Sequence, residues 1–323
     1  MDSRTPQPMT QRDFNKLLRD VSRSFYLSMR FLPGKMRGPV SLGYLLARAS
    51  DTLADTAKAP LPVRIETLAK FREAVLNDEP LPRLDTFFRH QSHAGEKVLL
   101  TKLDDCLIWM KQLNALDYES VRGVLDKITV GQQWDLKKAA EIRQRPVSHD
   151  ELEQYTYSVA GCVGEFWTRV GYDNLGKKFA DPEDREALMH SGKMFGQGLQ
   201  LINILRDIGE DLENGRCYLP VEKTIQQGLI DEPTLLLREM SFWQATCRDW
   251  IGEGWNYLEK VRHHRVRFAT ALPLIIGERT LTRLEAEGEN ALSNRIKIDR
   301  KEVKQILWKA WWARKSVDKL HEI

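Results

Sequence analysis

Hydrophobic residues recur every three to four positions along most of the 323-residue chain, and no long run alternates between apolar and polar residues. This period is typical of helices with one buried face, whereas alternation would indicate strands. We therefore predict an all-α fold. The predicted helices cover about residues 9–21, 36–57, 61–77, 95–117, 119–141, 148–172, 183–213, 232–264, 266–286 and 300–320.

Short clusters of helix-breaking residues separate these segments, as at Pro33-Gly34, Pro60-Leu-Pro62 and Pro80-Leu-Pro82. None of the gaps is long enough, or rich enough in serine and glycine, to be a domain linker. We find no internal repeat and no low-complexity tract. The simplest prediction is one helical domain over residues 1–323, with residues 1–10 flexible and a large central cavity between long helices.

Composition narrows the function classes. Hydrophobic residues make up 42% and charged residues 29% of the chain, which is enough apolar material for a sizeable core. The 49 basic and 46 acidic residues give a formal net charge of only +3. Because nucleic-acid-binding proteins usually carry a strongly basic surface, we expect no nucleic-acid partner.

The cysteines and the apolar runs bear on the compartment. The four cysteines are widely spaced and contain no C-x-x-C pair, so we interpret them as reduced thiols. Residues 1–10 are polar and do not resemble a secretory signal. The longest apolar run, 268–276, is interrupted by Pro273 and is far shorter than the ~20 residues that span a bilayer. We expect a cytoplasmic protein that can also lie on the inner face of the membrane.

The first stretch with recognisable chemistry is a polar stripe on an otherwise apolar helix. Asp51 and Asp55 are four residues apart, so their side chains share one helix face. Arg48 and Tyr44 fall on the same stripe, among leucines and alanines. A helix that is apolar elsewhere therefore presents a single ordered polar line.

A second stripe follows in the predicted helix over 183–213. Its members are spaced by three, four and four residues and share a face: Gln200, Asn203, Asp207 and Asp211. Leu199, Ile202 and Leu205 occupy another side, while Arg206 and Glu210 flank the stripe. Here too an apolar helix carries a row of oxygen ligands.

Two pairs of carboxylates on apolar helix faces are stabilised by a bound cation. Unpaired charges on an apolar helix are costly, and like charges four residues apart repel each other. Magnesium accepts carboxylate and amide oxygens and bridges to substrate phosphates. One D-x-x-x-D pair alone is usually a solvated surface paired with lysine or arginine. Two such pairs on two apolar helices favour the hypothesis of magnesium ions held against a diphosphate.

With these helices in place, the chain resembles the squalene and phytoene synthase family from about residue 22 to about residue 304. Four stretches carry the resemblance: Ser22-Arg-Ser-Phe25, Tyr44-Leu-Leu-Ala-Arg-Ala-Ser-Asp-Thr-Leu-Ala-Asp55, Tyr155-Thr-Tyr-Ser-Val-Ala-Gly-Cys-Val-Gly164, and Asn203-Ile-Leu-Arg-Asp-Ile-Gly-Glu-Asp-Leu-Glu-Asn-Gly-Arg-Cys-Tyr-Leu-Pro220. Their shared order and spacing are more specific than either acidic pair. The resemblance implies an isoprenoid synthase helical fold.

The resemblance also implies roles for individual residues. Asp51, Asp55, Asp207 and Asp211 would hold Mg2+ on the substrate diphosphates, and Tyr155 matches the catalytic tyrosine of the family. The implied diphosphate-binding residues are Ser22, Arg23, Ser24, Tyr44, Arg48, Gln200, Asn203, Arg206 and Arg216. From spacing alone, a packed core tyrosine is the better interpretation of Tyr155, and only the family match favours a catalytic role. For Gly161 and Gly164, close approach to an apolar ligand and helix–helix contact both fit.

The implied reaction joins two farnesyl diphosphates head to head. Ionisation of one allylic diphosphate is followed by attack of the second and by proton loss, which gives presqualene diphosphate. A second ionisation, a rearrangement and hydride transfer from NADPH would give squalene. Metal ions and arginines stabilise the leaving diphosphate, and a dry pocket protects the cation.

The NADPH prediction depends on a short basic stretch. Gly196-Gln-Gly198 lacks the third glycine and the preceding strand of a dinucleotide fingerprint. Residues 295–301 resemble a basic stretch that squalene synthases place near the NADPH phosphates, although Asp299 stands where a basic residue is expected. Lys297 and Arg300 are the candidate cofactor-binding residues, and ordinary charge at a helix start explains them equally well.

The predicted C-terminal helix is basic and rich in tryptophan. Residues 295–323 contain nine Lys or Arg and four Asp or Glu. An apolar stripe that includes Ile306, Ala310 and Trp311 favours docking onto the core, with Trp308 and Trp312 flanking it. Peripheral membrane contact through residues 300–320 is the second interpretation. The transmembrane tail of animal and fungal squalene synthases has no counterpart here, which favours a bacterial type.

Several other functions share these features. A phytoene or dehydrosqualene synthase, or an enzyme that stops at presqualene diphosphate, would use no NADPH. A non-catalytic assembly factor of the same fold would lose the aspartates, whereas all four are present. A terpene cyclase would carry a different second metal motif, rich in Asn, Ser and Glu, which we do not find. The Asp51–Asp55 motif and the basic stretch favour squalene synthase.

Overall fold

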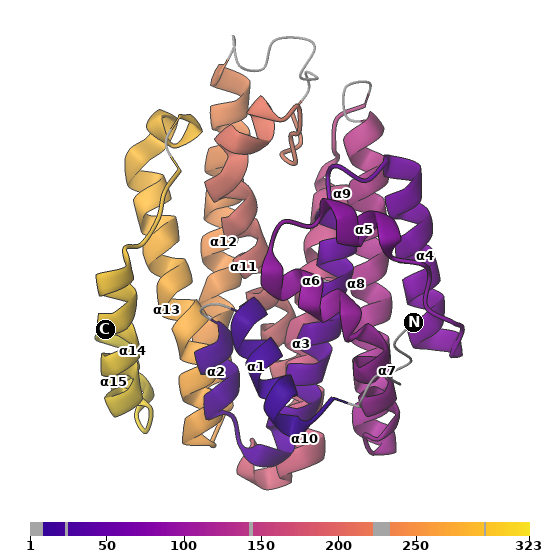
Figure 1. Cartoon of the computed structure of the whole chain (residues 1–323). Helices are drawn as coiled ribbons and strands as arrows, with labels where there is room; N and C mark the ends of the chain where they lie inside the picture. The colour runs from indigo at the N-terminus through magenta and orange to yellow at the C-terminus, as the bar shows by residue number, and fades with distance from the viewer. Residues whose placement is uncertain (1–8, 23–24, 142–144, 222–232, 294) are drawn as a thin grey trace.

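The computed structural model describes residues 9–22, 25–141, 145–221, 233–293 and 295–323, and the regular elements within these ranges are all helices (Figure 1). The first half contains α1 (Gln11–Ser22), α2 (Phe25–Phe31), α3 (Gly34–Asp55), α4 (Leu61–Asn77), α5 (Asp85–His90), α6 (Ala94–Thr101), α7 (Leu103–Lys111) and α8 (Ala115–Glu141). The second half contains α9 (His149–Thr156), α10 (Cys162–Leu175), α11 (Arg185–Glu213), α12 (Pro233–Lys260), α13 (His264–Glu287), α14 (Arg300–Ala313) and α15 (Val317–His321). The predicted all-α class is confirmed.

The long helices lie roughly alongside one another, with α14 and α15 at one edge and α4 at the other (Figure 1). On the C-terminal side, α11 packs against α12, α12 against α13, and α13 against α14. On the N-terminal side, α8 packs against both α3 and α4. The helix α10 contacts both α3 and α11, so it joins the two helices that carry the acidic stripes.

The apolar core crosses the boundary between the two halves of the chain. Its larger cluster is built mainly from α1 to α8, yet it also includes Tyr257 and Val266 from α12 and α13. A second cluster lies between α11, α12, α13 and α14. Phe31 of α2 contacts Phe268 and Trp311, with ring centroids 5.2 Å and 4.7 Å apart. The N-terminal segment therefore packs against the C-terminal helices, as expected for a single domain.

Glycines allow α10 and α11 to approach closely. A Cβ atom added to Gly164 would lie 1.8 Å from the carbonyl oxygen of Gly192, and one added to Gly196 would lie 2.4 Å from that of Ala160. No side chain fits where two backbones meet at such distances. Of the two interpretations of Gly164, helix–helix contact is the one that the structure supports. Gly161 likewise faces Gln197 of α11, at 2.8 Å from its Cγ.

Three of the predicted helices are interrupted in the structure. The segment 95–117 contains α6 and α7, which meet at Lys102, together with the first residues of α8, and 300–320 contains α14 and α15 with a turn between them. Within 148–172, one π-helical turn, η1 (Tyr157–Gly161), separates α9 from α10. Period alone cannot reveal such breaks, because the apolar face continues across them. In contrast, α4 has the predicted bounds.

Two short helices were not predicted. The short helices α2 and α5 have seven and six residues, too few for a period to be recognised. Pro273 lies inside α13, in agreement with the predicted helix over 266–286. Its neighbours Leu272, Leu274 and Ile275 are buried, so packing outweighs the lost backbone hydrogen bond.

No helix in the described ranges is long and apolar enough to cross a bilayer. All four cysteines are buried and unpaired, which agrees with their interpretation as thiols.

Candidate active site

The first acidic pair lies at the end of α3, where it meets groups from α6 and α8. Arg48 forms an ion pair with Glu96 and lies 3.8 Å from a carboxylate oxygen of Asp51. Gln132 of α8 donates a hydrogen bond to Asp51 from its side-chain amide. The ion pair with Glu96 raises the pKa of Arg48 despite the opposing effect of burial, so this guanidinium stays charged. Asp55 shares the same end of the helix.

The protonation of this pair reflects its crowded surroundings. Burial, followed by the charge of Asp55, raises the pKa of Asp51 to about 7. Burial and the nearby Asp135 raise the pKa of Asp55 as well. The Asp51 side chain nevertheless keeps 43% of its surface accessible to solvent. A carboxylate that water can reach, but that protein surrounds closely enough to shift its pKa, is what a recessed cation site requires.

The second acidic pair lies in the last turns of α11. Arg206 binds Asp207 through two hydrogen bonds of 3.0 Å and 2.6 Å. Arg295, from the segment before α14, lies 3.0 Å from Asp207 and 3.1 Å from Glu210. Burial raises the pKa of Asp211 to about 7, and its acidic neighbours add to the shift against the opposing charge of Arg216. Asp207 is thus paired directly with two arginines, whereas the charge of Arg216 offsets only part of the shift at Asp211.

Two side chains connect the acidic pairs, and sequence reasoning identified only one of them. Arg216, which follows α11, acts electrostatically on Asp55, Asp135 and Asp211. Asp135 of α8 was missed. It accepts a 2.6 Å hydrogen bond from the hydroxyl of Tyr218, and its charge reaches both Asp55 and Asp211.

The signal for Asp135 was present in the sequence. Gln132 and Asp135 are three residues apart on α8, between the buried residues Ile128 and Leu136, so they repeat on a smaller scale the polar stripe of the other two helices. Burial raises the pKa of Asp135, although the hydrogen bond from Tyr218 opposes this shift. The site thus contains carboxylates from three helices: α3, α8 and α11.

Tyr155 lies beside these carboxylates in an aromatic stack. Its ring is stacked on Tyr218, with centroids 5.5 Å apart and planes 10° apart, and it contacts Trp134 at 5.0 Å. Burial, followed by the charge of Asp135, raises the pKa of Tyr155 well above its ordinary value. The hydroxyl therefore stays protonated at neutral pH. Tyr155 packs against the apolar core and also lies within the electrostatic reach of Asp51 and Asp55.

The other predicted site residues differ in burial and in their hydrogen-bond partners. Ser22 is buried and donates to the carbonyl of Leu18, and the hydroxyl of Tyr44 donates to the carbonyl of Val21 at 3.4 Å. Asn203 donates to Gln200 at 3.3 Å on the α11 stripe. Lys297 and Arg300 are exposed, near the start of α14. Arg23 and Ser24 lie outside the described residues.

The donor set fits magnesium bound together with a substrate. Within the described ranges, no three His, Cys, Asp or Glu side chains are grouped closely enough to hold an ion on their own. Magnesium commonly takes one or two carboxylates and completes its shell with water and substrate phosphates. Burial is the largest cause of the raised pKa values of Asp51 and Asp211, to about 7, and in each case a neighbouring carboxylate adds to the shift. A divalent cation would favour the charged form of both carboxylates.

Comparison with known proteins is consistent with this geometry. Residues 18–302 match the family model described as squalene/phytoene synthase. The chain belongs to the squalene/phytoene synthase family. A squalene synthase of Gibberella zeae is 30% identical over 223 residues, which are 68% of this chain and 45% of that protein. Phytoene synthase 3 of Zea mays is 26% identical over 302 residues, 92% of this chain and 64% of the maize protein. The chain therefore spans less than two thirds of these relatives.

Solved structures share the fold. A ligand complex of TcSQS superposes with a TM-score of 0.74 at 20% identity, over 96% of this chain and 89% of that one. A dehydrosqualene synthase gives a TM-score of 0.61 at 22% identity, over 95% of this chain and 98% of the other. The helical isoprenoid synthase fold is thus confirmed, while the central cavity and the roles of individual residues stay predictions.

Proposed function

We propose that this protein condenses two farnesyl diphosphates head to head, through presqualene diphosphate, to squalene. One observation carries the proposal: Asp55 and Asp211, from the two acidic stripes, both lie within the electrostatic reach of Arg216 and Asp135. A diphosphate that enters between the stripes would meet carboxylates for its metal ions and guanidinium groups for its oxygens. Family membership supports the reaction class.

The first task of the site is to stabilise the leaving diphosphate. Asp51, Asp55 and Asp211 would hold Mg2+, with Asp207 joining once its arginine partners move to the substrate. Bound magnesium supplies Lewis-acid stabilisation of the charge that develops on the diphosphate. Within the site, Arg48 and Arg216 each have a pKa that neighbouring acidic or phenolic groups raise, so each can contact phosphate oxygens while fully charged.

The second task is to control the proton and exclude water. Since the pKa of Tyr155 is raised, its hydroxyl acts as a proton or hydrogen-bond donor and not as a phenolate base. The proton lost on forming the cyclopropane would therefore be accepted by released diphosphate, with Tyr155 orienting that acceptor. The rings of Trp134, Tyr155 and Tyr218 form an apolar wall that can shield a carbocation from water.

The last step distinguishes squalene synthase from its relatives. We assign the NADPH phosphates to the side chains of Lys297 and Arg300, which are exposed and basic and lie in the segment that also supplies Arg295 to Asp207. Without this step, the same site would give presqualene diphosphate, dehydrosqualene or, from a longer prenyl diphosphate, phytoene. The similarity to the Zea mays phytoene synthase and to a dehydrosqualene synthase makes this the second candidate function.

Product analysis separates the candidates. The purified chain is incubated with farnesyl diphosphate and Mg2+, with and without NADPH, and the extracted products are identified by mass spectrometry. Squalene formed only with NADPH supports the proposal, and a product unchanged by NADPH refutes it in favour of the second candidate. Asp51→Asn and Asp211→Asn should each abolish turnover. If the unmodified protein also shows no turnover, the result would indicate the non-catalytic assembly factor. The intact acidic stripes argue against that function.

A further inference from the structure

The helix α14 has one buried face and one face that no other element of the described residues covers. Ile306, Ala310 and Ala313 are buried against the core, and the Trp311 ring packs on Phe268 at 5.3 Å. This confirms the docking predicted for the apolar stripe. The opposite side of the helix, which we call the α14 outer face, consists of Lys301, Lys304, Gln305, Trp308, Lys309 and Trp312.

Two tryptophans on the outer face have no role in the fold. Trp308 and Trp312 each keep 68% of their surface exposed, the highest values among the large hydrophobic residues of the described chain that are classed as exposed. They are four residues apart, so the two indole rings share one side of the helix. Exposure of a tryptophan ring to water is unfavourable, and two adjacent exposed rings are typical of a surface that contacts a partner or a membrane.

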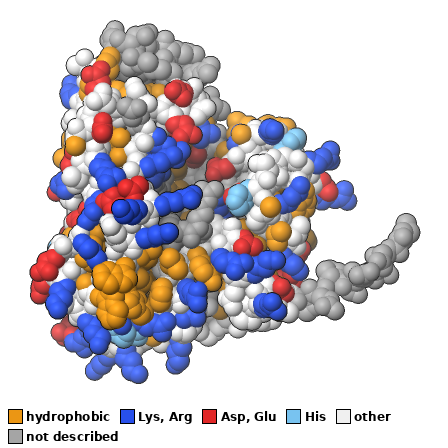
Figure 2. Space-filling view, turned by 60° about the vertical axis from the view of Figure 1, so that its left-hand side comes forward, with side chains coloured by type: hydrophobic (Ala, Val, Ile, Leu, Met, Phe, Trp, Pro, Cys, Tyr) orange, Lys and Arg blue, Asp and Glu red, His pale blue; other side chains and the backbone are white. Residues whose placement is uncertain are grey.

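The surroundings of these rings are uniformly basic. Lysines 301, 304 and 309 share their face, and the acidic residue nearest to them on the helix, Glu302, is engaged by Arg279 and Arg283 on the inner side. Figure 2, which brings this edge of the molecule forward, shows an apolar patch bordered by Lys and Arg. The lysines therefore attract an anionic partner to the α14 outer face, and an apolar layer of that partner would accommodate the rings of Trp308 and Trp312.

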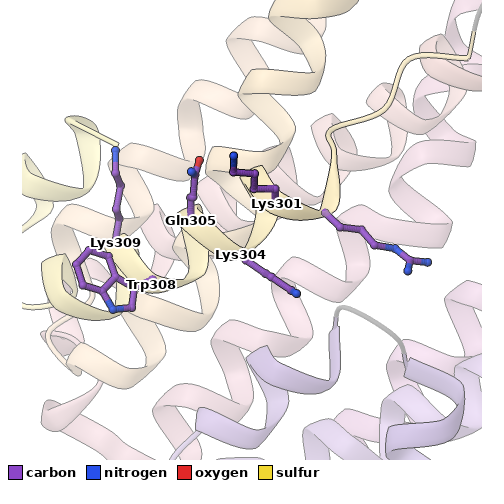
Figure 3. A pocket seen from close by; sticks show the side chains of 6 residues that line it. Lys301, Lys304, Gln305, Trp308 and Lys309 are labelled. Atoms are coloured by element: carbon purple, nitrogen blue, oxygen red, sulfur yellow. The ribbon is translucent and has the colours of Figure 1, made fainter.

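The shape of the face argues against a small-molecule ligand. A depression that is open to solvent lies along it, and every residue that lines it belongs to α14 (Figure 3). A small ligand would be held from one side only, whereas ligand sites usually enclose most of the ligand. A second copy of the chain, docked symmetrically, would bring lysines against lysines. A flat anionic layer with an apolar interior meets neither difficulty.

We propose that the α14 outer face docks the protein on an anionic lipid bilayer, with Trp308 and Trp312 inserted at the level of the headgroups. Amphipathic helices with lysines beside tryptophans bind in this way, the rings gaining an interfacial position while the lysine stems extend towards phosphates. The inference does not depend on the proposed reaction. It places the axis of α14 parallel to the membrane surface.

Vesicle flotation with the full chain tests the docking. We compare vesicles of phosphatidylcholine alone with vesicles that contain one third phosphatidylglycerol. The unmodified chain should float with the anionic vesicles, and 0.5 M salt should weaken the binding because it screens the lysines. In Trp308→Ala/Trp312→Ala the bound-to-free ratio should fall by about tenfold or more. Because both rings are exposed, the circular dichroism spectrum and the Tm should not change.

Two matched control variants distinguish binding through the α14 outer face from nonspecific hydrophobic binding and from the effect of net charge. Leu116→Ala/Phe242→Ala removes two exposed apolar side chains elsewhere and should bind normally. Lys301→Glu/Lys304→Glu/Lys309→Glu should lose binding, whereas Lys16→Glu/Lys58→Glu/Lys97→Glu, with the same change in net charge, should retain most of it.

Four results would overturn the proposal. The first two are that the unmodified chain does not float with anionic vesicles, or that Trp308→Ala/Trp312→Ala floats equally well. The third is that the unmodified chain is a dimer which only the tryptophan variant dissociates. The fourth is that the tryptophan variant loses NADPH binding while its flotation is unchanged. Formation of presqualene diphosphate in detergent should be the same in all these variants. A failure of the proposed reaction therefore leaves this test intact.

Discussion

The contact between α10 and α11 gives the sharpest test of the packing that holds the site. A Cβ atom at position 164 would lie 1.8 Å from the carbonyl oxygen of Gly192, whereas real Cβ atoms essentially never approach other atoms below 3.0 Å. The Gly164→Ala chain must therefore shift one helix by at least 1.2 Å, the difference between these distances. Neither group is the end of a flexible side chain, so the backbone itself has to move.

The magnitude follows from what such a shift disturbs. Near Gly164, the hydroxyl of Thr168 lies 3.0 Å from that of Tyr257, and Gly196 meets Ala160 one turn away. Overpacking of a well-packed interior typically costs about 1–3 kcal/mol, and a backbone clash belongs at the upper end. With an unfolding entropy of about 2.1 cal/mol/K per residue over 323 residues, ~3 kcal/mol corresponds to a Tm lowered by about 4–5 °C.

Gly123→Ala is the matched control. Gly123 also lies inside a long helix, α8, but a Cβ atom there would have no atom within 4 Å. Alanine stabilises an unobstructed helix position by about 0.5–1 kcal/mol relative to glycine, so the Tm should rise by about 1 °C. Thermal unfolding followed by circular dichroism compares both variants. If Gly164→Ala melts within 1 °C of the unmodified chain, the close packing of α10 on α11 is refuted.

Tyr155→Phe removes only a hydroxyl, so we expect the Tm to hold while turnover of farnesyl diphosphate falls by about a hundredfold or more; near-normal turnover would contradict the assigned role. Because burial raises the pKa of Asp51 to about 7, above the ~3.9 of an unfolded chain, the folded chain binds more protons between these values. Asp51 therefore lowers the free energy of unfolding as the pH rises from about 4 to 7. In Asp51→Asn, the Tm measured in EDTA should fall less steeply over this pH range. Identical slopes of Tm against pH for the two chains would argue against the raised pKa. Arg295→Gln breaks a partly exposed ion pair with Asp207, for which we expect a contribution of ~0–1 kcal/mol. A Tm lowered by more than about 2 °C would show that the contact contributes more to stability than a surface ion pair does.

The local pattern was sufficient to predict the helices that carry the acidic stripes. The spacing of Asp51 from Asp55, and of Asp207 from Asp211, fixes which side chains share a face once a helix forms, because helical geometry is set by the backbone. The structure places both pairs on long helices, α3 and α11, as predicted. The apolar side of α14 was equally readable, since its stripe has the helical period.

Contacts between distant segments were outside the reach of such patterns. Asp135 joins the site because α8 packs on α3, and Tyr218 reaches it from 83 residues further along the chain. A spacing rule applies only within one helix, so it could not assign this pair to the site. The breaks at Lys102 and at the π-helical turn before α10 were likewise missed, because an apolar face continues across both.

By itself, then, the sequence determined the all-α class, the two acidic stripes and the family, because each depends on order and spacing along the chain. Only the tertiary structure decided that Gly164 serves helix packing, that Arg295 reaches Asp207, and that Trp308 and Trp312 stay uncovered. Each of these depends on which surfaces meet when helices far apart in sequence pack together. That choice minimises the exposed apolar area of the whole chain, and no single segment contains it.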